Sequence, residues 1–177
     1  MAAQDGGMAE AGDMAQLRWE GFGGDLELIR EQLTRLVERA QGRAILLMDT
    51  AGRLLSWVGD EPRFDVTTFV SLLAADFCAT RELARLLGEE QFHSVSHQGE
   101  AVSLYLTQLT EGTILALAYD QETTLGLVRY RVGQALPEIA AAVRAGLGRA
   151  RAEVEPLGES FGAEARDQVA RFFDSLL

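Results

Sequence analysis

Few side chains in this sequence could serve as metal ligands, nucleophiles or general bases. His93 and His97 are the only histidines, and Cys78 is the only cysteine. On one strand the two histidines would share a face, but four residues at about 3.3 Å each place them roughly 13 Å apart, too far to hold one metal ion. Cys78 has no neighbouring base, and a small buried or interfacial thiol is the simpler interpretation. We therefore expect no metal site, no cofactor and no catalytic residue.

The composition excludes chemistry that depends on lysine. All 16 basic residues are arginine, whereas a Walker A loop, a kinase-type site and a pyridoxal enzyme each need a lysine. Residues 49–52, Asp-Thr-Ala-Gly, match the DxxG element of small GTPases, but no phosphate-binding loop accompanies them. We interpret them as a hairpin turn.

The net charge of −11 indicates which partners to expect. A strongly acidic protein repels phosphate backbones, so sequence-independent binding to nucleic acid is not expected. No run approaches the roughly 20 apolar residues that span a bilayer, and the N-terminus lacks the pattern of a secretory signal. With one cysteine, the composition favours a cytoplasmic protein that binds neither nucleic acid nor membrane.

The elements that must position any functional residues begin with a helix. Residues 1–24 show no periodicity and are predicted to be a flexible tail. From Asp25, apolar residues recur at helical spacing up to Gly42, which is placed as the C-terminal cap. Two short apolar runs, 43–49 and 53–58, are predicted to be buried strands joined by a tight turn.

A central helix is predicted over residues 65–87, with Asp65 capping its first turn and Gly88 ending it. One face is apolar: Val66, Phe69, Val70, Leu73, Phe77, Leu83, Ala84 and Leu87. The other side carries small or polar residues at a spacing of three or four: Ser71, Ala75, Cys78, Ala79 and Glu82. Small residues let another helix approach closely, so this side is a candidate interface.

Three more strands are predicted over residues 91–97, 100–109 and 112–119, joined by short turns and therefore antiparallel. The last run is continuously apolar, as expected of a central strand covered on both faces. A helix follows from about Thr124, kinked at Pro137 and closed by Gly146 and Gly148. Residues 25–150 thus form one domain, and 151–177 form an acidic linker followed by an amphipathic segment that is marginal alone.

Three motifs in this order carry a family resemblance. They are the run from Leu72 to Glu89, the run His97-Gln98-Gly99-Glu100, and residues 125–129, Leu-Gly-Leu-Val-Arg. Over about residues 25–145 the chain resembles the Roadblock family of dynein-light-chain-related proteins, and within it the bacterial mutual-gliding-protein B group. The resemblance implies an α+β, profilin-like, three-layer α/β/α fold. Its five-stranded antiparallel sheet would have the order 2-1-5-4-3.

The resemblance also implies a function. Members form homodimers in which the third strand pairs with its copy into one continuous sheet, and the two central helices lie side by side. Such dimers have no active site of their own. They dock on Ras-like small GTPases, here an MglA-like polarity GTPase. Two copies stimulate GTP hydrolysis by pressing the switch residues of the GTPase into position without an arginine finger, at a cell pole in polarity or motility. The resemblance places the GTPase contact at Ser71, Ala74, Ala75, Asp76, Cys78, Ala79 and Glu82 and the dimer contact at Phe92, His93, Val95 and His97.

The sequence leaves alternatives open. Relatives commonly read Ala-Gly-Asn where residues 74–76 read Ala-Ala-Asp, and the added methyl and charge favour a dimeric scaffold that recruits a partner without altering hydrolysis. A small-molecule sensor is a third possibility, although the apolar last strand leaves little room for a cavity. Arg81 and Arg85 are candidates for an arginine finger. The segment 161–176 either folds back on its own domain or contacts a partner.

Overall fold

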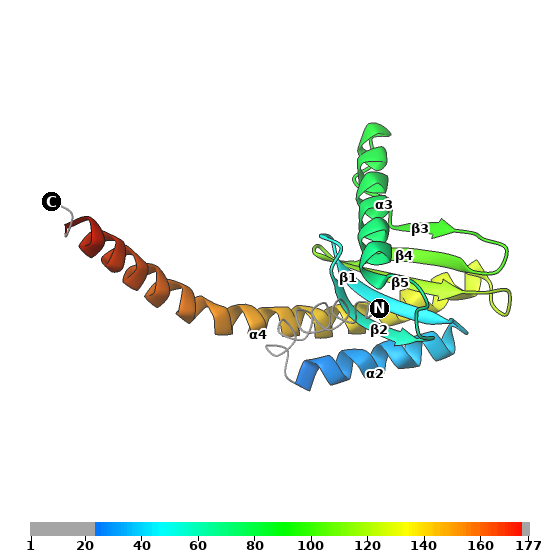
Figure 1. The fold of residues 1–177 in the computed structure, drawn as a ribbon. Helices are drawn as coiled ribbons and strands as arrows, with labels where there is room; N and C mark the ends of the chain where they lie inside the picture. Colours follow the sequence, from blue (N-terminus) through cyan, green and yellow to red (C-terminus); the bar gives the residue numbers. More distant parts are fainter. Residues whose placement is uncertain (1–23, 175–177) are drawn as a thin grey trace, which may run out of the picture.

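The computed structural model describes the backbone of residues 24–174 and the side chains of residues 25–149 (Figure 1). The predicted tail therefore lies outside the described residues, apart from Gly24, which opens the first helix. In chain order the elements are α2 (Gly24–Arg39), β1 (Ala44–Asp49), β2 (Leu54–Gly59), α3 (Val66–Leu86), β3 (Ser94–His97), β4 (Ser103–Thr110), β5 (Thr113–Tyr119) and α4 (Leu125–Asp174).

The sheet has the order β2-β1-β5-β4-β3, and every neighbouring pair is antiparallel. This confirms the predicted topology. The strand β5 lies between β1 and β4, with Ala44 opposite Ala118 at one end of the β1–β5 pair and Asp49 opposite Thr113 at the other. Two hairpins, β1–β2 and β4–β5, and the edge strand β3 therefore share one sheet.

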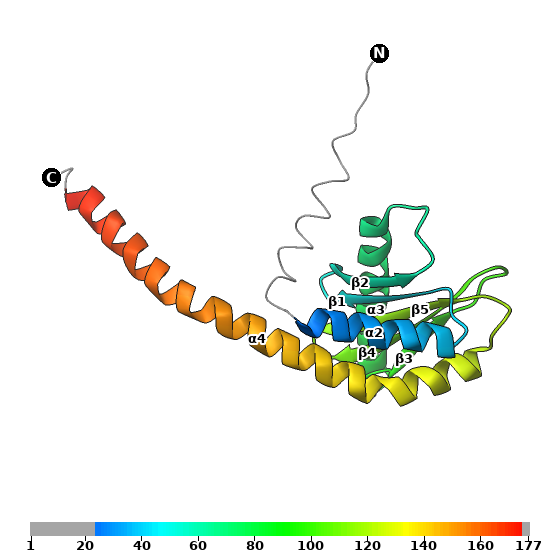
Figure 2. The same ribbon diagram turned by 90° about the horizontal axis from the view of Figure 1, so that it is seen from below.

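Alternation along the central strands explains why the sheet is covered on both faces. In β1, Ile45 and Leu47 point to one core, whereas Leu46 and Met48 point to the other. Successive side chains of a strand point to opposite faces, so a continuously apolar strand needs a layer on each side. The helices α2 and α4 supply one layer and α3 supplies the other (Figure 1, Figure 2). The predicted three-layer arrangement is confirmed.

The β1–β2 turn is built around Asp49. Its Oδ1 accepts hydrogen bonds from the backbone N–H of Ala51 at 3.0 Å and of Arg53 at 2.9 Å, and its Oδ2 lies 2.6 Å from Nε of Arg53. Gly52 takes a left-handed conformation with φ of 79°, which favours glycine. The DxxG run is thus a hairpin turn, as predicted.

The last helix differs from the prediction. The sequence predicts an end at Gly146 and Gly148 and a linker over 151–160, but α4 continues without interruption to Asp174 and extends well past the sheet (Figure 2). Beside the glycines, Nε of Arg149 donates to Oδ2 of Asp25 at 2.7 Å, which ties this part of the helix to the first turn of α2. No described helix is long and apolar enough to cross a membrane.

Candidate interaction surface

The helix α3 is fixed at both ends by local hydrogen bonds. Asp65 is the N-cap, and its carboxylate accepts from the backbone N–H of Thr67 at 3.1 Å and of Thr68 at 3.4 Å, as well as from the Thr68 hydroxyl. These bonds, the Thr68 hydroxyl first, lower the pKa of Asp65. At the other end Gly88, with φ of 79°, donates to the carbonyl of Arg85, and Glu89 donates to that of Ala84. This is a Schellman motif, so both predicted ends are confirmed.

The surface of α3 divides into three faces. At about 100° per residue, Val70, Leu73, Ala74, Phe77 and Ala84 fall on one side, and all five are buried. Ala74 is only 3% exposed and packs on the sheet, so it is the one residue of the predicted GTPase contact whose side chain is buried. The small-residue face, defined as Ser71, Ala75, Cys78, Ala79 and Glu82, points away from the core and is exposed or half-buried.

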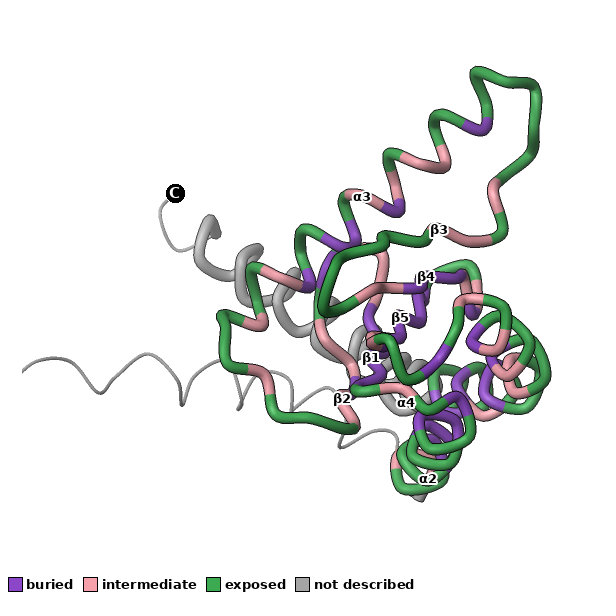
Figure 3. The backbone as a smooth tube through the Cα atoms, turned by 90° about the vertical axis from the view of Figure 1, so that its right-hand side faces the viewer, coloured by how far each residue is buried: buried purple, intermediate pink, exposed green. Residues whose placement is uncertain are grey.

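A third face of α3 consists of exposed leucines and adjoins the small-residue face so closely that, at about 100° per residue, Ala79 falls between Leu72 and Leu86. Leu72 is 64% exposed, Leu83 55%, Leu86 82% and Leu87 73%. We call these four residues the leucine face. The sequence analysis put Leu83 and Leu87 on the same apolar face as Val70, which is wrong. At about 100° per residue Leu83 falls beside Leu72, away from the buried residues, and Leu87 follows the last turn of α3, which extends past β3 (Figure 3). Leu72 and Leu86 were missed, although the spacing of 11 between Leu72 and Leu83 is a helical repeat of a second apolar face.

Part of the small-residue face packs against the β1–β2 turn. A Cβ atom placed on Gly52 would lie 2.9 Å from Cα of Ser71, so the β1–β2 turn approaches the helix closely. The thiol of Cys78 lies 3.9 Å from the carbonyl oxygen of Thr50 in the same turn. Small side chains at Ser71 and Cys78 therefore make room for this turn. Ala75, Ala79 and Glu82 remain exposed beside it.

The strand β3 forms an edge of the sheet next to α3. It pairs only with β4, so its outer backbone groups have no partner strand within the described chain. The strand begins at Ser94 and is shorter than the predicted 91–97, which leaves Phe92 and His93 in the preceding loop. Val95 and His97 do lie in it. An unpaired edge is a template for a further strand.

One polar contact joins β3 to α3. Nε2 of His97 lies 2.8 Å from Oδ2 of Asp76, with both side chains partly exposed. Asp76 is one of the two positions, with Ala75, at which the sequence analysis expected a departure from the family, and the structure places its carboxylate against His97. His93 contributes differently, because its backbone carbonyl accepts from the Thr107 hydroxyl at 2.9 Å. Among the described residues, no group of His, Cys, Asp or Glu could hold a metal ion.

An apolar groove of about 390 Å³ lies on the same face of the sheet, beside the first turns of α3. The sequence analysis expected little room for a cavity and missed it. Its aromatic wall is formed by Trp57, Phe64 and Phe69, with ring centroids 6.1 Å apart for Trp57 and Phe64 and 4.7 Å for Phe64 and Phe69. The floor is sheet: Ala44, Leu46, Leu104 and Ala118. The groove exists because α3 covers only part of this face.

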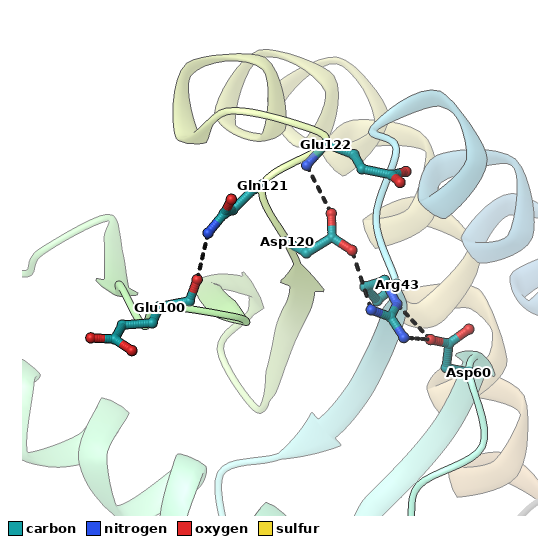
Figure 4. A network of polar contacts seen from close by, with 6 residues as sticks. All are labelled: Arg43, Asp60, Glu100, Asp120, Gln121 and Glu122. Carbon is teal, nitrogen blue, oxygen red and sulfur yellow. Dashed lines mark hydrogen bonds and ion pairs between the residues drawn. The ribbon is translucent and has the colours of Figure 1, made fainter.

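A polar network closes one end of this groove (Figure 4). Arg43 bridges two carboxylates, with Nε 2.6 Å from Oδ2 of Asp60 and Nη1 3.2 Å from Oδ2 of Asp120. The bonds to Asp60 and then Asp120 raise the pKa of Arg43. The backbone N–H of Glu122 donates to Asp120 at 2.9 Å, which is the largest cause of the lowered pKa of Asp120, followed by Arg43. The network joins β1, β2 and β5 at their shared end.

The two candidate arginine fingers lie in different settings. Arg85 is exposed and its Nη1 lies 2.9 Å from Oε1 of Glu82, on the small-residue face. Arg81 is half-buried, and its Nε is buried without a hydrogen-bond partner. Of the two, Arg85 is the one whose guanidinium is available at the surface.

Comparison with known proteins identifies the family to which the chain belongs. The Roadblock/LC7 domain model matches residues 28–118. MglB from Myxococcus xanthus is 33% identical over 66% of this chain and 95% of that one, with a TM-score of 0.63. The gliding protein MglB from Thermus thermophilus is 29% identical over 70% of this chain and 93% of that one, with a TM-score of 0.65.

A more distant structure shows the shared fold alone. A Roadblock/LC7 domain from Streptomyces avermitilis is 16% identical, with a TM-score of 0.59 over 65% of this chain and 97% of that one. A search of the curated proteins found no match. The matched region runs from α2 to the end of β5 and contains the whole sheet and α3. The chain therefore belongs to the Roadblock/LC7 family and is of the MglB type within it.

Proposed function

We propose that the chain is a homodimeric regulator of a Ras-like, MglA-like small GTPase and that it stimulates GTP hydrolysis by the GTPase. One observation carries the proposal: α3 presents two faces without partners, the leucine face and the small-residue face, next to an unpaired edge strand. Membership of the MglB type supports it. The chain would then accelerate hydrolysis by holding catalytic groups of the GTPase in position, and its own side chains would take no part in the reaction.

The dimer follows from the leucine face and β3. Exposed leucines at the overhanging end of α3 are unfavourable in water, and a second copy can cover them. A two-fold axis at β3 would pair this strand with its copy, continue the sheet, and lay each overhang on the face of the other subunit. Val95 and His97 then lie at the centre of the interface. Phe92 and His93 lie at its margin, in the loop before β3.

The GTPase contact follows from the small-residue face. Of its members, Ala75 and Ala79 are short and exposed, so the backbone of another protein can approach the helix. Glu82 and the Arg85 beside it offer a charged margin for orientation. In the dimer the leucines would turn inward, and the part of each small-residue face farthest from them, at Ser71, Cys78 and Glu82, would remain outside.

Single-turnover GTP hydrolysis by the cognate MglA-like GTPase tests the proposal. We expect a saturating concentration of the chain to raise the rate of GTP hydrolysis by about 10-fold or more, as positioning effects commonly do. Ala75→Arg should abolish stimulation, because a long charged side chain would hold the surfaces apart. Ala141→Arg, on an exposed position of α4 on the opposite face, is the matched control and should leave stimulation unchanged. Unchanged hydrolysis with wild-type chain at saturation would reject activation.

A scaffold that binds the GTPase without stimulating it is the second candidate. The observation that favours it is Asp76, whose carboxylate is held by His97 at the junction of α3 and β3. Relatives commonly carry a neutral asparagine there, so a fixed negative charge is able to change how a switch region docks. Binding of the GTPase with unchanged turnover identifies this function. Asp76→Asn would then be expected to restore stimulation.

A further inference from the structure

A narrow cleft of about 90 Å³ opens between α2 and α4, on the face of the sheet opposite α3. Three arginines line it: Arg35 and Arg39 come from α2 and Arg131 comes from α4. The chain as a whole carries a net charge of −11. One carboxylate, that of Glu138, also lines the cleft, so the three guanidinium groups outnumber it and leave a positive site on an acidic protein, where an anion would be concentrated.

Two buried polar atoms at this cleft have no hydrogen-bond partner. Gln32 is buried, and its Nε2 donates to Oε1 of Glu138 at 3.0 Å, but its Oε1 has no partner. Nε of Arg131 is likewise buried and unpaired. Buried polar atoms in folded proteins nearly always have partners, so the unpaired acceptor and the unpaired donor at this cleft are both open to a bound group that offers an acceptor and a donor.

The arginine charges are only partly balanced by the protein. Arg35 forms an ion pair with Glu31 outside the cleft, and this bond raises the pKa of Arg35. Arg131 approaches only neutral groups, with Nη1 3.5 Å from Oε1 of Gln134 and the guanidinium carbon 5.5 Å from the centre of the Tyr130 ring. Among the described residues no carboxylate pairs with Arg131 or Arg39, so their charges are available to a ligand.

We propose that this cleft binds a phosphate-type oxyanion that bridges α2 and α4. Its oxygens would accept from Arg131 and Arg39, in the geometry that guanidinium groups share with phosphate. A phosphate that keeps one proton can also donate to Oε1 of Gln32 or to Glu138, which a carboxylate cannot do. The second pKa of a phosphate monoester is about 6, so this protonated form is present near neutral pH. The ligand would be free phosphate or a phosphate group carried by another molecule.

Titration of the full chain with inorganic phosphate tests the proposal, with sodium chloride of equal ionic strength as the reference. Calorimetry and the melting temperature are both recorded. We expect saturable binding with a dissociation constant of about 1 mM, weakened about 10-fold or more by Arg131→Gln or Arg39→Gln. Arg129→Gln, at an exposed position of α4 that does not line the cleft, is the matched control and should bind as wild type does.

Several outcomes would overturn the proposal. One is the absence of saturable heat up to about 20 mM phosphate, where such a site would be filled. Another is binding by Arg131→Gln and by Arg39→Gln that is as tight as binding by wild type. Acetate binding as tightly as phosphate would reject the phosphate class. If Arg131→Gln unfolds, the exposed Arg39 still provides the test. Tighter binding of O-phosphoserine than of phosphate would identify a carried phosphate group, and weaker binding would identify the free ion. None of these measurements depends on GTP hydrolysis.

Discussion

The two faces of the sheet differ in how completely the chain covers them. On one face α2 and α4 lie side by side and bury a continuous core that runs from Ile29 to Val143. On the other, α3 alone crosses the strands, packs on Leu46 and Leu106, and leaves both the apolar groove and the leucine face open. The first face stabilises the monomer, whereas the second is suited to recognition. Stability and binding should therefore be separable by mutation.

The largest expected effect separates the two faces through stability. Leu33→Ala, which empties a fully buried site beneath α2, should lower the free energy of unfolding by about 2–5 kcal/mol. Leu83→Ala, which removes the same atoms from the leucine face, should change it by less than about 0.5 kcal/mol in dilute monomer. Urea denaturation at low protein concentration measures both. Equal losses would mean that the leucine face belongs to the core of the monomer.

The next effect concerns association. Leu86→Arg places a charge in the proposed dimer interface twice, once per subunit, and should weaken dimerisation by about 100-fold or more. Analytical ultracentrifugation over a concentration series measures it. Leu28→Arg, an exposed leucine of α2 on the opposite face, is the control and should sediment as wild type does. A Leu86→Arg chain that still dimerises would place the interface elsewhere.

Much of the fold could be predicted from sequence because its signals are local. Continuous apolar runs predicted β1 and β5 as central strands, and Asp65 and Gly88 predicted the ends of α3. The leucine face was missed because one apolar face was assumed: at about 100° per residue Leu83 falls with Leu72 and not with Val70. The course of α4 was missed because Gly146 and Gly148 were interpreted as its end, and the contact that ties this part of the helix to α2, Arg149 with Asp25, spans 124 positions and leaves no local signal. The groove depends on how much of the sheet α3 leaves open.

A smaller effect tests the contact between α3 and the β1–β2 turn. Gly52 and Gly88 share the same left-handed φ of 79°, but only Gly52 has a neighbour that a new Cβ would meet. Gly88→Ala should cost about 1–2 kcal/mol from backbone strain alone. Gly52→Ala should cost about 1–3 kcal/mol more, since the methyl would collide with Ser71. Chemical denaturation of both variants isolates the difference, and similar losses would show that the turn can move away from the helix.

The smallest effect is the pH dependence of the network at the end of the groove. The lowered pKa of Asp120 means that its ionised form stabilises the folded state above the unfolded pKa of about 3.9, and that this contribution is lost as the pH falls below it. Between about pH 4 and pH 2, the urea midpoint of wild type should therefore fall more steeply than that of Asp120→Asn. The Asp120 side chain is partly exposed and its partner Arg43 is half exposed, so solvent screens the bridge and the difference should be small. Parallel curves would show that the Arg43 bridge contributes nothing measurable.

The place of β5 in the sheet has a consequence for how the protein is made. During synthesis β1 emerges early, but its second neighbour, β5, follows at least 64 residues later, counted from Asp49 to its partner Thr113 (113 − 49 = 64). At 5–20 residues per second the ribosome needs roughly 3–13 s to supply it. Throughout that interval one edge of β1, among the most apolar strands of the chain, has no strand to pair with. Slow codons or a depleted chaperone pool in this window should therefore lower the yield of folded protein more than the same delay after Tyr119.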